Sequence, residues 1–203
     1  MDSLNAWRPK RTSTNNFESK LRSVRDPARS YSFGNGAISA AMEDTLAGFR
    51  VLPIAPALAQ EVRSTLKSPQ YGHPAHVELA TGYGPCRECL QQFRTGEEDR
   101  ILFTYNPFAG LDAYPSPGPV FIHAKSCPAF AEAQLFPQEL RSLPLTLEAY
   151  GENRWIIARE RPSEPEIEEC IERLLSTSGV CYIHVRNTEA GCFIARIERD
   201  RVE

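Results

Sequence analysis

Two short pairs of cysteine and histidine residues limit how this chain can fold more than any other feature of its sequence. Two residues separate Cys86 from Cys89, and three separate His123 from Cys127. The first spacing lets both thiolates of a tight knuckle face one ion, and the second suits a ligand pair where a loop meets a helix. Three thiolates and one imidazole fill a tetrahedral zinc shell and leave no open position. The pattern therefore predicts a structural zinc site formed by these four residues.

The order of the two pairs along the chain resembles that of treble-clef zinc fingers. In such fingers a knuckle precedes a strand pair and the second ligand pair lies at the start of a helix, so we expect a short helix to begin at Cys127-Pro128. The thirty-three residues between Cys89 and His123 form a longer insertion than in that finger, whose second pair is more often spaced H-x2-C. Two alternatives remain open. The four residues could have a structural role without metal, with Cys127 a small buried apolar residue, or Cys86 and Cys89 could be a redox dithiol.

The six cysteines do not by themselves imply disulfide bonds. No apolar signal segment stands at the N-terminus to direct the chain to an oxidising compartment, so the thiols are expected to be reduced. No apolar run approaches the roughly 18 residues that span a bilayer. We therefore expect a soluble cytoplasmic protein without a membrane partner.

The composition of residues 1–45 predicts a disordered basic tail. This segment is rich in Ser, Arg and Asn, lacks apolar periodicity and contains Gly34-Asn35-Gly36. Seven basic and three acidic side chains give residues 1–41 a net charge of +4. Two other origins remain open, because the composition also fits an organellar transit peptide and because Met42 could be the natural start of the protein.

The rest of the chain is acidic. Its net charge is −7, the difference between the total of −3 and the +4 of residues 1–41. An acidic domain gains nothing from counterion release on DNA or RNA, so its charge argues against nucleic-acid binding by the folded part. A small ligand or a protein remains as the class of partner.

The hydrophobic pattern of residues 46–203 predicts a single α+β domain of antiparallel hairpins with two or three helices. One helix is expected at 57–66, with Pro56 at its first position. Another is expected after Glu164, where apolar residues at helical spacing form one stripe, namely Ile167, Ile171, Leu174 and Leu175.

Strands are expected from runs of β-branched and aromatic residues bounded by turn residues. Two of them flank the turn at 151–154, and the last two form a C-terminal hairpin around 187–191. The expected strands cover 49–54, 77–80, 101–105, 120–122, 145–150, 155–159, 180–186 and 192–199.

A second group of candidate residues lies near the C-terminus. His184 and Arg186 alternate on a predicted strand, so both side chains point to the same face. An imidazole beside a guanidinium could bind an anion such as a carboxylate or phosphate. With His73 as general base, and Glu189 as a further polar group, they would form a hydrolase-like catalytic site. The alternative is the solvated face of a half-buried sheet, with His73 hydrogen-bonded in its turn.

Other residues have simpler interpretations. Cys192 follows a turn without a helix N-terminus or a catalytic motif beside it, so we expect it to pack rather than react. His76 has no partner in the sequence. The aromatic loop at 105–108 and Tyr114 either line a pocket near the metal or seal a small core. The chain lacks a Gly-rich phosphate loop, H-E-x-x-H and G-x-S-x-G, so the commonest nucleotide and hydrolase sites are unsupported.

Six motifs spread along the chain carry a resemblance to a known family. They are FRVLP from Phe49, YGHP from Tyr71, GPCR from Gly84 with Cys89-Leu90, TYNPF from Thr104, GPVFIHA from Gly118 with Cys127, and HVRN from His184 with GCFIAR from Gly191. Together they resemble the bacterial domain of unknown function 1203, over about 49–199 and without the tail. The resemblance implies no activity, because no reaction is established for that family.

The leading hypothesis is a zinc-stabilised binding protein with no established reaction. An enzyme with a polar site at His73, His184 and Arg186 is the alternative, and a thiol redox protein is the second alternative. The two main hypotheses differ in metal coordination, because four protein ligands indicate a structural site and three ligands with water indicate a catalytic one.

Overall fold

The computed structural model describes residues 48–111, 116–152 and 154–200. The tail predicted at 1–45, Met42 and Tyr114 lie outside the described residues. The boundary of the predicted domain therefore stays a prediction.

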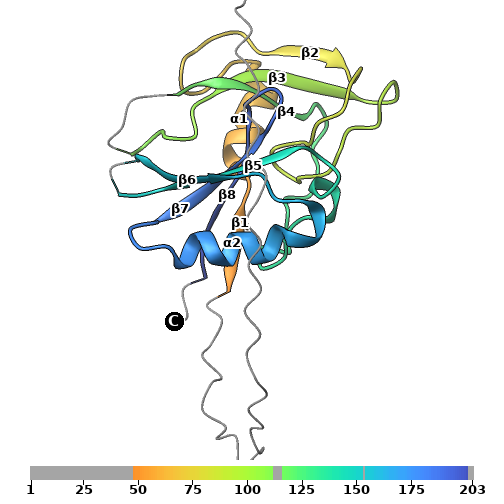
Figure 1. Ribbon diagram of the computed structural model, residues 1–203. Coiled ribbons are helices and arrows are strands. Elements are labelled where there is room, and N and C mark those ends of the chain that lie inside the picture. Colours follow the sequence, from red (N-terminus) through yellow and green to blue (C-terminus); the bar gives the residue numbers. More distant parts are fainter. Residues whose placement is uncertain (1–47, 112–115, 153, 201–203) are drawn as a thin grey trace, which may run out of the picture. The chain divides into compact units, whose positions relative to one another are not determined.

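Five strands with alternating side chains form the larger of two sheets (Figure 1). Every neighbouring pair is antiparallel, in the order β1-β8-β7-β5-β6. Because side chains alternate along a strand, each strand sends one set to each face of the sheet. The strands are β1 (Phe49–Leu52), β5 (Leu145–Tyr150), β6 (Ile156–Glu160), β7 (Tyr182–Asn187) and β8 (Phe193–Arg199).

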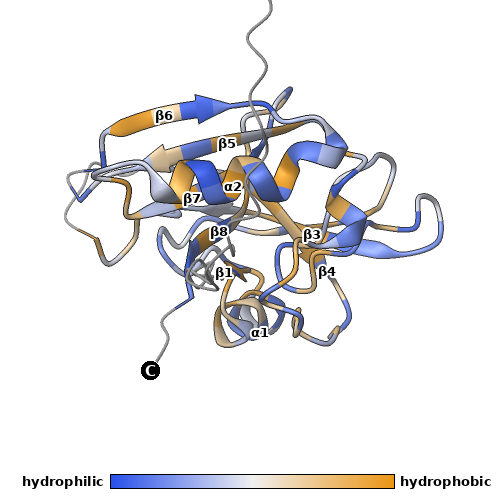
Figure 2. Cartoon of the chain, turned by 60° about the horizontal axis from the view of Figure 1, so that its bottom comes forward, coloured by the Kyte–Doolittle hydropathy of each residue, from blue (hydrophilic) through white to orange (hydrophobic). Residues whose placement is uncertain are grey.

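The first face of this sheet packs against α2 (Ile167–Ser176), which follows the short helix η2 (Glu164–Glu166). Figure 2 shows hydrophobic and hydrophilic bands along α2. Acidic residues lie in its first turn and Arg173 in its last, as the helix dipole favours. The apolar stripe is buried against the sheet and forms the main core with residues such as Leu147, Ile183 and Val185.

The opposite face of the sheet carries polar and aromatic side chains. His184 on β7 lies opposite Arg196 on β8 and opposite Glu148 on β5, so the three form one row across the sheet. Tyr182 and Tyr150 form the next row. This face therefore gathers charged and aromatic groups from strands that are far apart in the sequence.

A second sheet holds β2 (His76–Leu79), β3 (Asp99–Tyr105) and β4 (Gly118–His123) in that order. It shares a core with α1 (Pro56–Thr65), which starts at a proline and ends at Leu66 in a left-handed conformation, φ 50°. Val62 of α1 packs in this core with residues such as Ile101 and Ile122. Strand β4 contacts β8, and Figure 1 shows this sheet on the side of the larger sheet that α2 does not cover.

The α+β class with antiparallel sheets and two α-helices is confirmed. The helix expected to begin at Cys127 is wrong, because the chain after it is irregular up to the short helix η1 (Gln138–Leu140). Its backbone groups serve distant partners: Phe130 N–H donates to Glu88 O at 3.2 Å, and Ala133 O accepts from Val51 N–H at 2.7 Å. These long-range bonds replace the local bonds that a helix needs.

Neither α-helix in the part of the chain that the structure describes combines the length and apolar character needed to cross a bilayer.

Candidate metal centre

A tight knuckle positions the first two candidate ligands. Leu90 N–H donates to Cys86 O at 2.9 Å, and Arg87 N–H donates to Phe121 O at 2.9 Å, which ties the knuckle to β4. Leu90 has a positive φ of 60°, a conformation that costs a non-glycine residue roughly 1–2 kcal/mol. Its side chain is buried in the main core, and this burial offsets the strain.

Strand β4 and the loop after it bring the second pair to the knuckle. His123 ends β4, and its backbone N–H donates to Cys86 Sγ at 3.4 Å. The next loop returns Cys127 to the same place, with its Sγ 3.9 Å from Cys86 Sγ. On the other side of the cluster, Cys89 Sγ lies 3.5 Å from His123 Nδ1.

The four side chains predicted as ligands are therefore brought together. One donor atom from each lies within 4.8 Å of the others, two of the residues being buried and two half-buried. A cluster of three cysteines and one histidine at this spacing has the composition and geometry of a metal-binding site.

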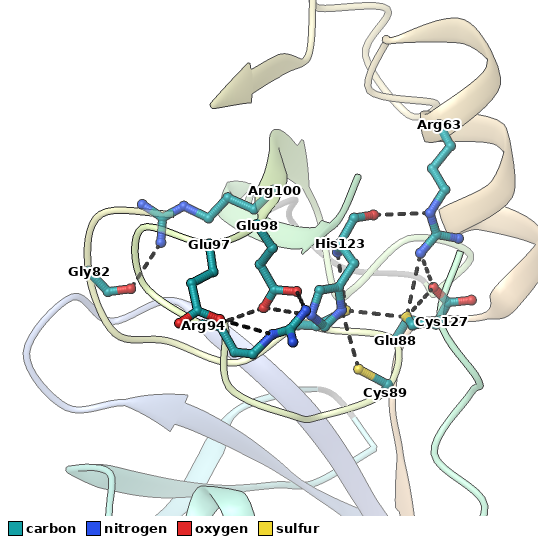
Figure 3. A network of polar contacts seen from close by, with 11 residues as sticks. Arg63, Gly82, Glu88, Cys89, Arg94, Glu97, Glu98, Arg100, His123 and Cys127 are labelled. Carbon is teal, nitrogen blue, oxygen red and sulfur yellow. Dashed lines mark hydrogen bonds and ion pairs between the residues drawn. The ribbon is translucent and has the colours of Figure 1, made fainter. Parts of the chain in front are cut away.

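A carboxylate orients the imidazole of this cluster. His123 Nε2 lies 3.5 Å from Glu98 Oε1, on the opposite side of the ring from the thiols (Figure 3). The backbone N–H of Arg94 donates to the same carboxylate at 2.6 Å and lowers its pKa. Histidine ligands commonly donate their second N–H to a carboxylate, which fixes the tautomer. Here that arrangement leaves Nδ1 facing the sulfur atoms.

A buried ion pair holds the other half of the cluster (Figure 3). Arg63 of α1 pairs with Glu88 of the knuckle, and their side chains are only 8% and 4% exposed. Arg63 Nε donates to His123 O at 3.0 Å, and its Nη2 lies 3.7 Å from Cys127 Sγ. The thiol of Cys127 lies 3.3 Å from Glu88 Oε2. Helix α1 is thus bonded to both residues of the second ligand pair.

A second arginine is buried between the cluster and β8. Arg87 Nε donates to Phe193 O at 2.7 Å, and its Nη1 donates to Pro85 O. Burial lowers the pKa of Arg87 to about 10, while Cys192 and Cys86 act in the opposite direction. Among the described residues Arg87 has no carboxylate partner. Sulfur atoms are therefore the groups that can compensate its charge.

The protonation of the cluster reflects how closely its groups pack. Hydrogen bonds from Cys127 and Cys89 lower the pKa of Cys86, and the same contact raises the pKa of Cys127. The hydrogen bond to Cys86 raises the pKa of His123 to about 10. The cluster therefore favours a thiolate at Cys86 and retains protons on Cys127 and His123, which a bound metal cation would replace.

An open groove of about 840 Å³ borders the cluster. Cys89, His123 and Cys127 line it, together with apolar residues of the following loop such as Phe130, and with Lys125. Cys86 does not line it and is fully buried. The groove places ligand-sized space directly beside three of the four candidate ligands.

The second predicted group of residues is placed differently. His184 is 0% exposed, and four aromatic rings surround it at 4.9–5.1 Å, those of Phe108, Tyr150, Tyr182 and Phe193. Burial lowers its pKa to about 2, and the charges of Arg186 and Arg196 act in the same direction. The interpretation of this sheet face as solvated is wrong at His184, because the loop after β3 covers it.

The residues of the hydrolase-like alternative have separate partners. Arg186 Nε lies 2.7 Å from Glu148 Oε2, and its Nη1 donates to Gly191 O at 3.0 Å. His73 is exposed and stacks on Tyr71 at 5.6 Å, and Glu189 accepts a hydrogen bond from Tyr83. No hydrogen bond or ion pair joins His73 to His184 or Arg186 within the described ranges.

The aromatic loop takes part in a different cavity from the one expected. Tyr105 and Pro107 line a small cavity of about 210 Å³ with Arg186 and Cys192. None of the four candidate metal ligands lines it, and Phe108 is instead buried in a small core with Tyr150 and Tyr182, which was the second alternative for this loop. Cys192 is half-buried, with its thiol 3.6 Å from Ala190 O, and His76 is exposed at the start of β2.

Sequence reasoning missed the charged residues around both groups. Arg63, Glu88 and Glu98 look like ordinary surface charges in the sequence, and only their tertiary contacts identify them. The sequence does indicate a role for Glu148 and Arg196, because each is a charged residue between two apolar residues of a predicted strand, and its side chain therefore points to the opposite face from theirs. That signal identifies a shared face but not the partners on neighbouring strands.

Comparison with known proteins identifies the family and nothing beyond it. No curated protein and no solved structure matches the chain. A family model described as "Protein of unknown function (DUF1203)" matches residues 83–199, more than half of the chain. The match includes all four candidate metal ligands, whereas the motifs from Phe49 and from Tyr71 lie before it. No reaction follows from this match, and the chain belongs to the DUF1203 family of proteins of unknown function.

Proposed function

We propose that the protein is a zinc-stabilised binding protein, in which Cys86, Cys89, His123 and Cys127 hold one zinc ion. The observation that carries the proposal is the convergence of the four donor atoms, which all lie within 4.8 Å of one another. Zinc bonds of about 2.3 Å to sulfur and about 2.0–2.1 Å to nitrogen give tetrahedral edges of roughly 3.8 Å (S–S) and roughly 3.6 Å (S–N). The distances of 3.9 Å between Cys86 and Cys127 and of 3.5 Å between Cys89 and His123 lie close to these values.

The charges around the cluster support a metal–thiolate centre. Zinc with three thiolates and a neutral imidazole carries a net charge of −1. Arg87 is a buried cation without a carboxylate partner in the described part of the chain, and Cys86 is among the groups that compensate it. Arg63 approaches Cys127 from the other side at 3.7 Å. Tetrahedral sulfur and nitrogen donors favour zinc over the oxygen-loving cations.

The role of the metal in this proposal is structural. Four protein ligands fill the coordination shell, so no position is left for a reactive water. The ion would join the knuckle, the end of β4 and the irregular loop after it, at the edge of the core that the second sheet shares with α1. The binding surface would be the groove of about 840 Å³ beside the cluster, whose wall the ion stabilises.

The six cysteines are free, which supports a reducing compartment such as the cytoplasm. The redox alternative needs only Cys86 and Cys89. The convergence of His123 and Cys127 on the same point favours metal over a dithiol.

The test is elemental analysis of the purified protein, followed by thermal melting with and without a chelator. We expect about one zinc per chain and a melting temperature that falls when the chelator removes it, because binding energy of a structural metal is folding energy. Cys86→Ser should lose the metal and melt at the lower temperature even without chelator.

Cys181→Ser is the matched control, since Cys181 is half-buried at the edge of an aromatic cluster away from the metal ligands, and its thiol donates to Gly179 O at 3.8 Å. This variant should retain zinc. The proposal would be overturned if the parent protein contained no metal and melted at the same temperature as Cys86→Ser. A reversible disulfide between Cys86 and Cys89 that is insensitive to chelator would establish the redox alternative instead.

A further inference from the structure

Unpartnered buried polar atoms gather on one face of the larger sheet. In the described ranges, the buried side-chain nitrogen and oxygen atoms without a hydrogen-bond partner belong to Arg50, Arg154, Tyr182, His184, Arg186 and Arg196. The strand residues among them all belong to β1, β7 and β8, on the side opposite α2. Two of these atoms still face a carboxylate, since Arg50 Nε lies 3.3 Å from Asp200 and Arg186 Nε lies 2.7 Å from Glu148.

The atoms without any acceptor define a smaller set, which we call the donor cluster: Arg154, Tyr182, His184 and Arg196. Arg196 lies over the ring of Tyr182, with its Cζ 4.0 Å from the centroid. The imidazole of His184 is 5.1 Å from the same ring. Arg154 lies 6.0 Å from the ring of Phe108, which in turn packs against His184 at 4.9 Å. These contacts thus link the four side chains into one cluster, in which Arg154 is joined to His184 through Phe108.

The charge of this region is unbalanced. Glu148 pairs with both Arg159 and Arg186, and Glu198 pairs with Arg196 at 2.6 Å. Among the residues that the structure describes, four arginines, counting Arg154, therefore meet two glutamates, and two positive charges are left over. Burial raises the pKa of Tyr182, while the charges of Arg196 and Arg154 and the approach of the Arg154 guanidinium to the hydroxyl oppose the shift. The approach of Arg154 does not have the geometry of a hydrogen bond, so within the described ranges the hydroxyl and the guanidinium both remain unpartnered.

Unsatisfied buried donors are costly, at roughly 1–3 kcal/mol each, so several in one place require an explanation. The excess of donors and of positive charge indicates what is missing, which is an acceptor with negative charge. A carboxylate or phosphate accepts several N–H and O–H groups at once and pairs with guanidinium in a planar geometry. The side chain of Arg196 is 27% exposed, which leaves an approach from solvent.

We propose that the donor cluster binds a small anion, a carboxylate or a phosphate group, at the Tyr182 hydroxyl between Arg154 and Arg196, with His184 as a neutral donor at the base. The site uses none of the metal ligands and does not depend on zinc. It gives the protein a ligand class, namely small anionic metabolites or a free inorganic anion.

The experiment measures the melting temperature and the calorimetric binding of the full-length protein with inorganic phosphate and, separately, with acetate. Ionic strength is held constant with chloride. One of the two anions should raise the melting temperature in a saturable way, which also distinguishes phosphate from carboxylate chemistry. Arg196→Met should raise Kd about tenfold or more, the effect of losing one hydrogen bond to a charged group.

Tyr182→Phe keeps the test valid if the arginine variant fails to fold. It removes only the hydroxyl, so without anion it should be as stable as the parent or more stable, and its response to anion should be weakened. Arg161→Met removes one positive charge at an exposed position and should bind as the parent does. The proposal is overturned if neither anion binds, or if Tyr182→Phe and Arg196→Met respond like the parent. A less stable Tyr182→Phe without any anion response would assign these donors to bound water, which also overturns it.

Discussion

The burial of His184 predicts a specific loss of stability in acid. Its imidazole is 0% exposed, and its pKa is lowered to about 2, first by burial and then by Arg186 and Arg196. In the unfolded chain the same group has a pKa of about 6.5. Between these two values the unfolded state binds a proton that the folded state does not. Stability is therefore present above about pH 6.5 and is lost as the pH falls below it.

The magnitude follows from the size of that window. Each pH unit below the unfolded pKa costs about 1.4 kcal/mol, so about pH 4.5 should cost roughly 2.7 kcal/mol through this residue alone. His184→Leu replaces the imidazole by an apolar side chain of similar size, so it should remove this contribution. The free energy of unfolding is measured by urea titration at about pH 7 and about pH 4.5 in zwitterionic buffers.

The control is His73→Leu, because His73 is exposed and its ring stacks on Tyr71. This variant should lose as much stability in acid as the parent. The reasoning would be refuted if the parent and His184→Leu lost equal amounts between the two pH values, since His184 would then be protonated in the folded protein or accessible to solvent.

Three further predictions concern the polar contacts. Arg63→Met leaves the buried carboxylate of Glu88 without its cationic partner and should cost about 3–5 kcal/mol of unfolding free energy by urea titration. A double variant that also carries Glu88→Leu should recover much of this loss, and equal losses in the two variants would contradict a buried ion pair. Glu98→Ala removes the acceptor that faces His123 Nε2 and should weaken zinc binding about 10- to 100-fold in chelator competition, because the carboxylate orients the imidazole ligand. Unchanged affinity would exclude that role. Burial and the hydrogen bond to Glu148 raise the pKa of Tyr150 to about 12, so its contribution to stability is intact below about pH 10 and is lost as the pH rises toward 12. In thermal melting at alkaline pH, Tyr150→Phe should lose less stability than the parent, and identical melting curves would contradict the raised pKa.

Local patterns in the sequence were enough to predict most strands and both helices. In β5 the apolar residues Leu145, Leu147 and Ala149 alternate with Thr146 and Glu148, and the predicted bounds match the strand. Such alternation depends only on neighbouring residues. It does not reveal that β1 pairs with β8, because those strands are joined by long-range contacts that no local pattern encodes. The helix expected after Cys127 failed for the same reason, since its backbone bonds go to the knuckle and to β1.

The two candidate sites differ in how far the sequence could predict them. The metal cluster could be predicted because each ligand pair is local in the sequence and its spacing limits where the two side chains can point. Its supporting residues could not be predicted, since Arg63 and Glu98 gain their roles only when α1 and the turn before β3 meet the cluster. The pairing of His184 and Arg186 on one face was correct, but the burial of His184 depends on Phe108, which lies far away in the sequence.

The central claim is that three sulfur atoms and one nitrogen atom hold a zinc ion in a closed shell. X-ray absorption at the zinc edge on the purified protein measures this directly. The account predicts three sulfur atoms at about 2.3 Å and one nitrogen atom at about 2.0–2.1 Å, with no oxygen ligand. A shell with fewer sulfur atoms and a bound water would contradict it and indicate an open, catalytic centre, and a protein without zinc would refute the site altogether.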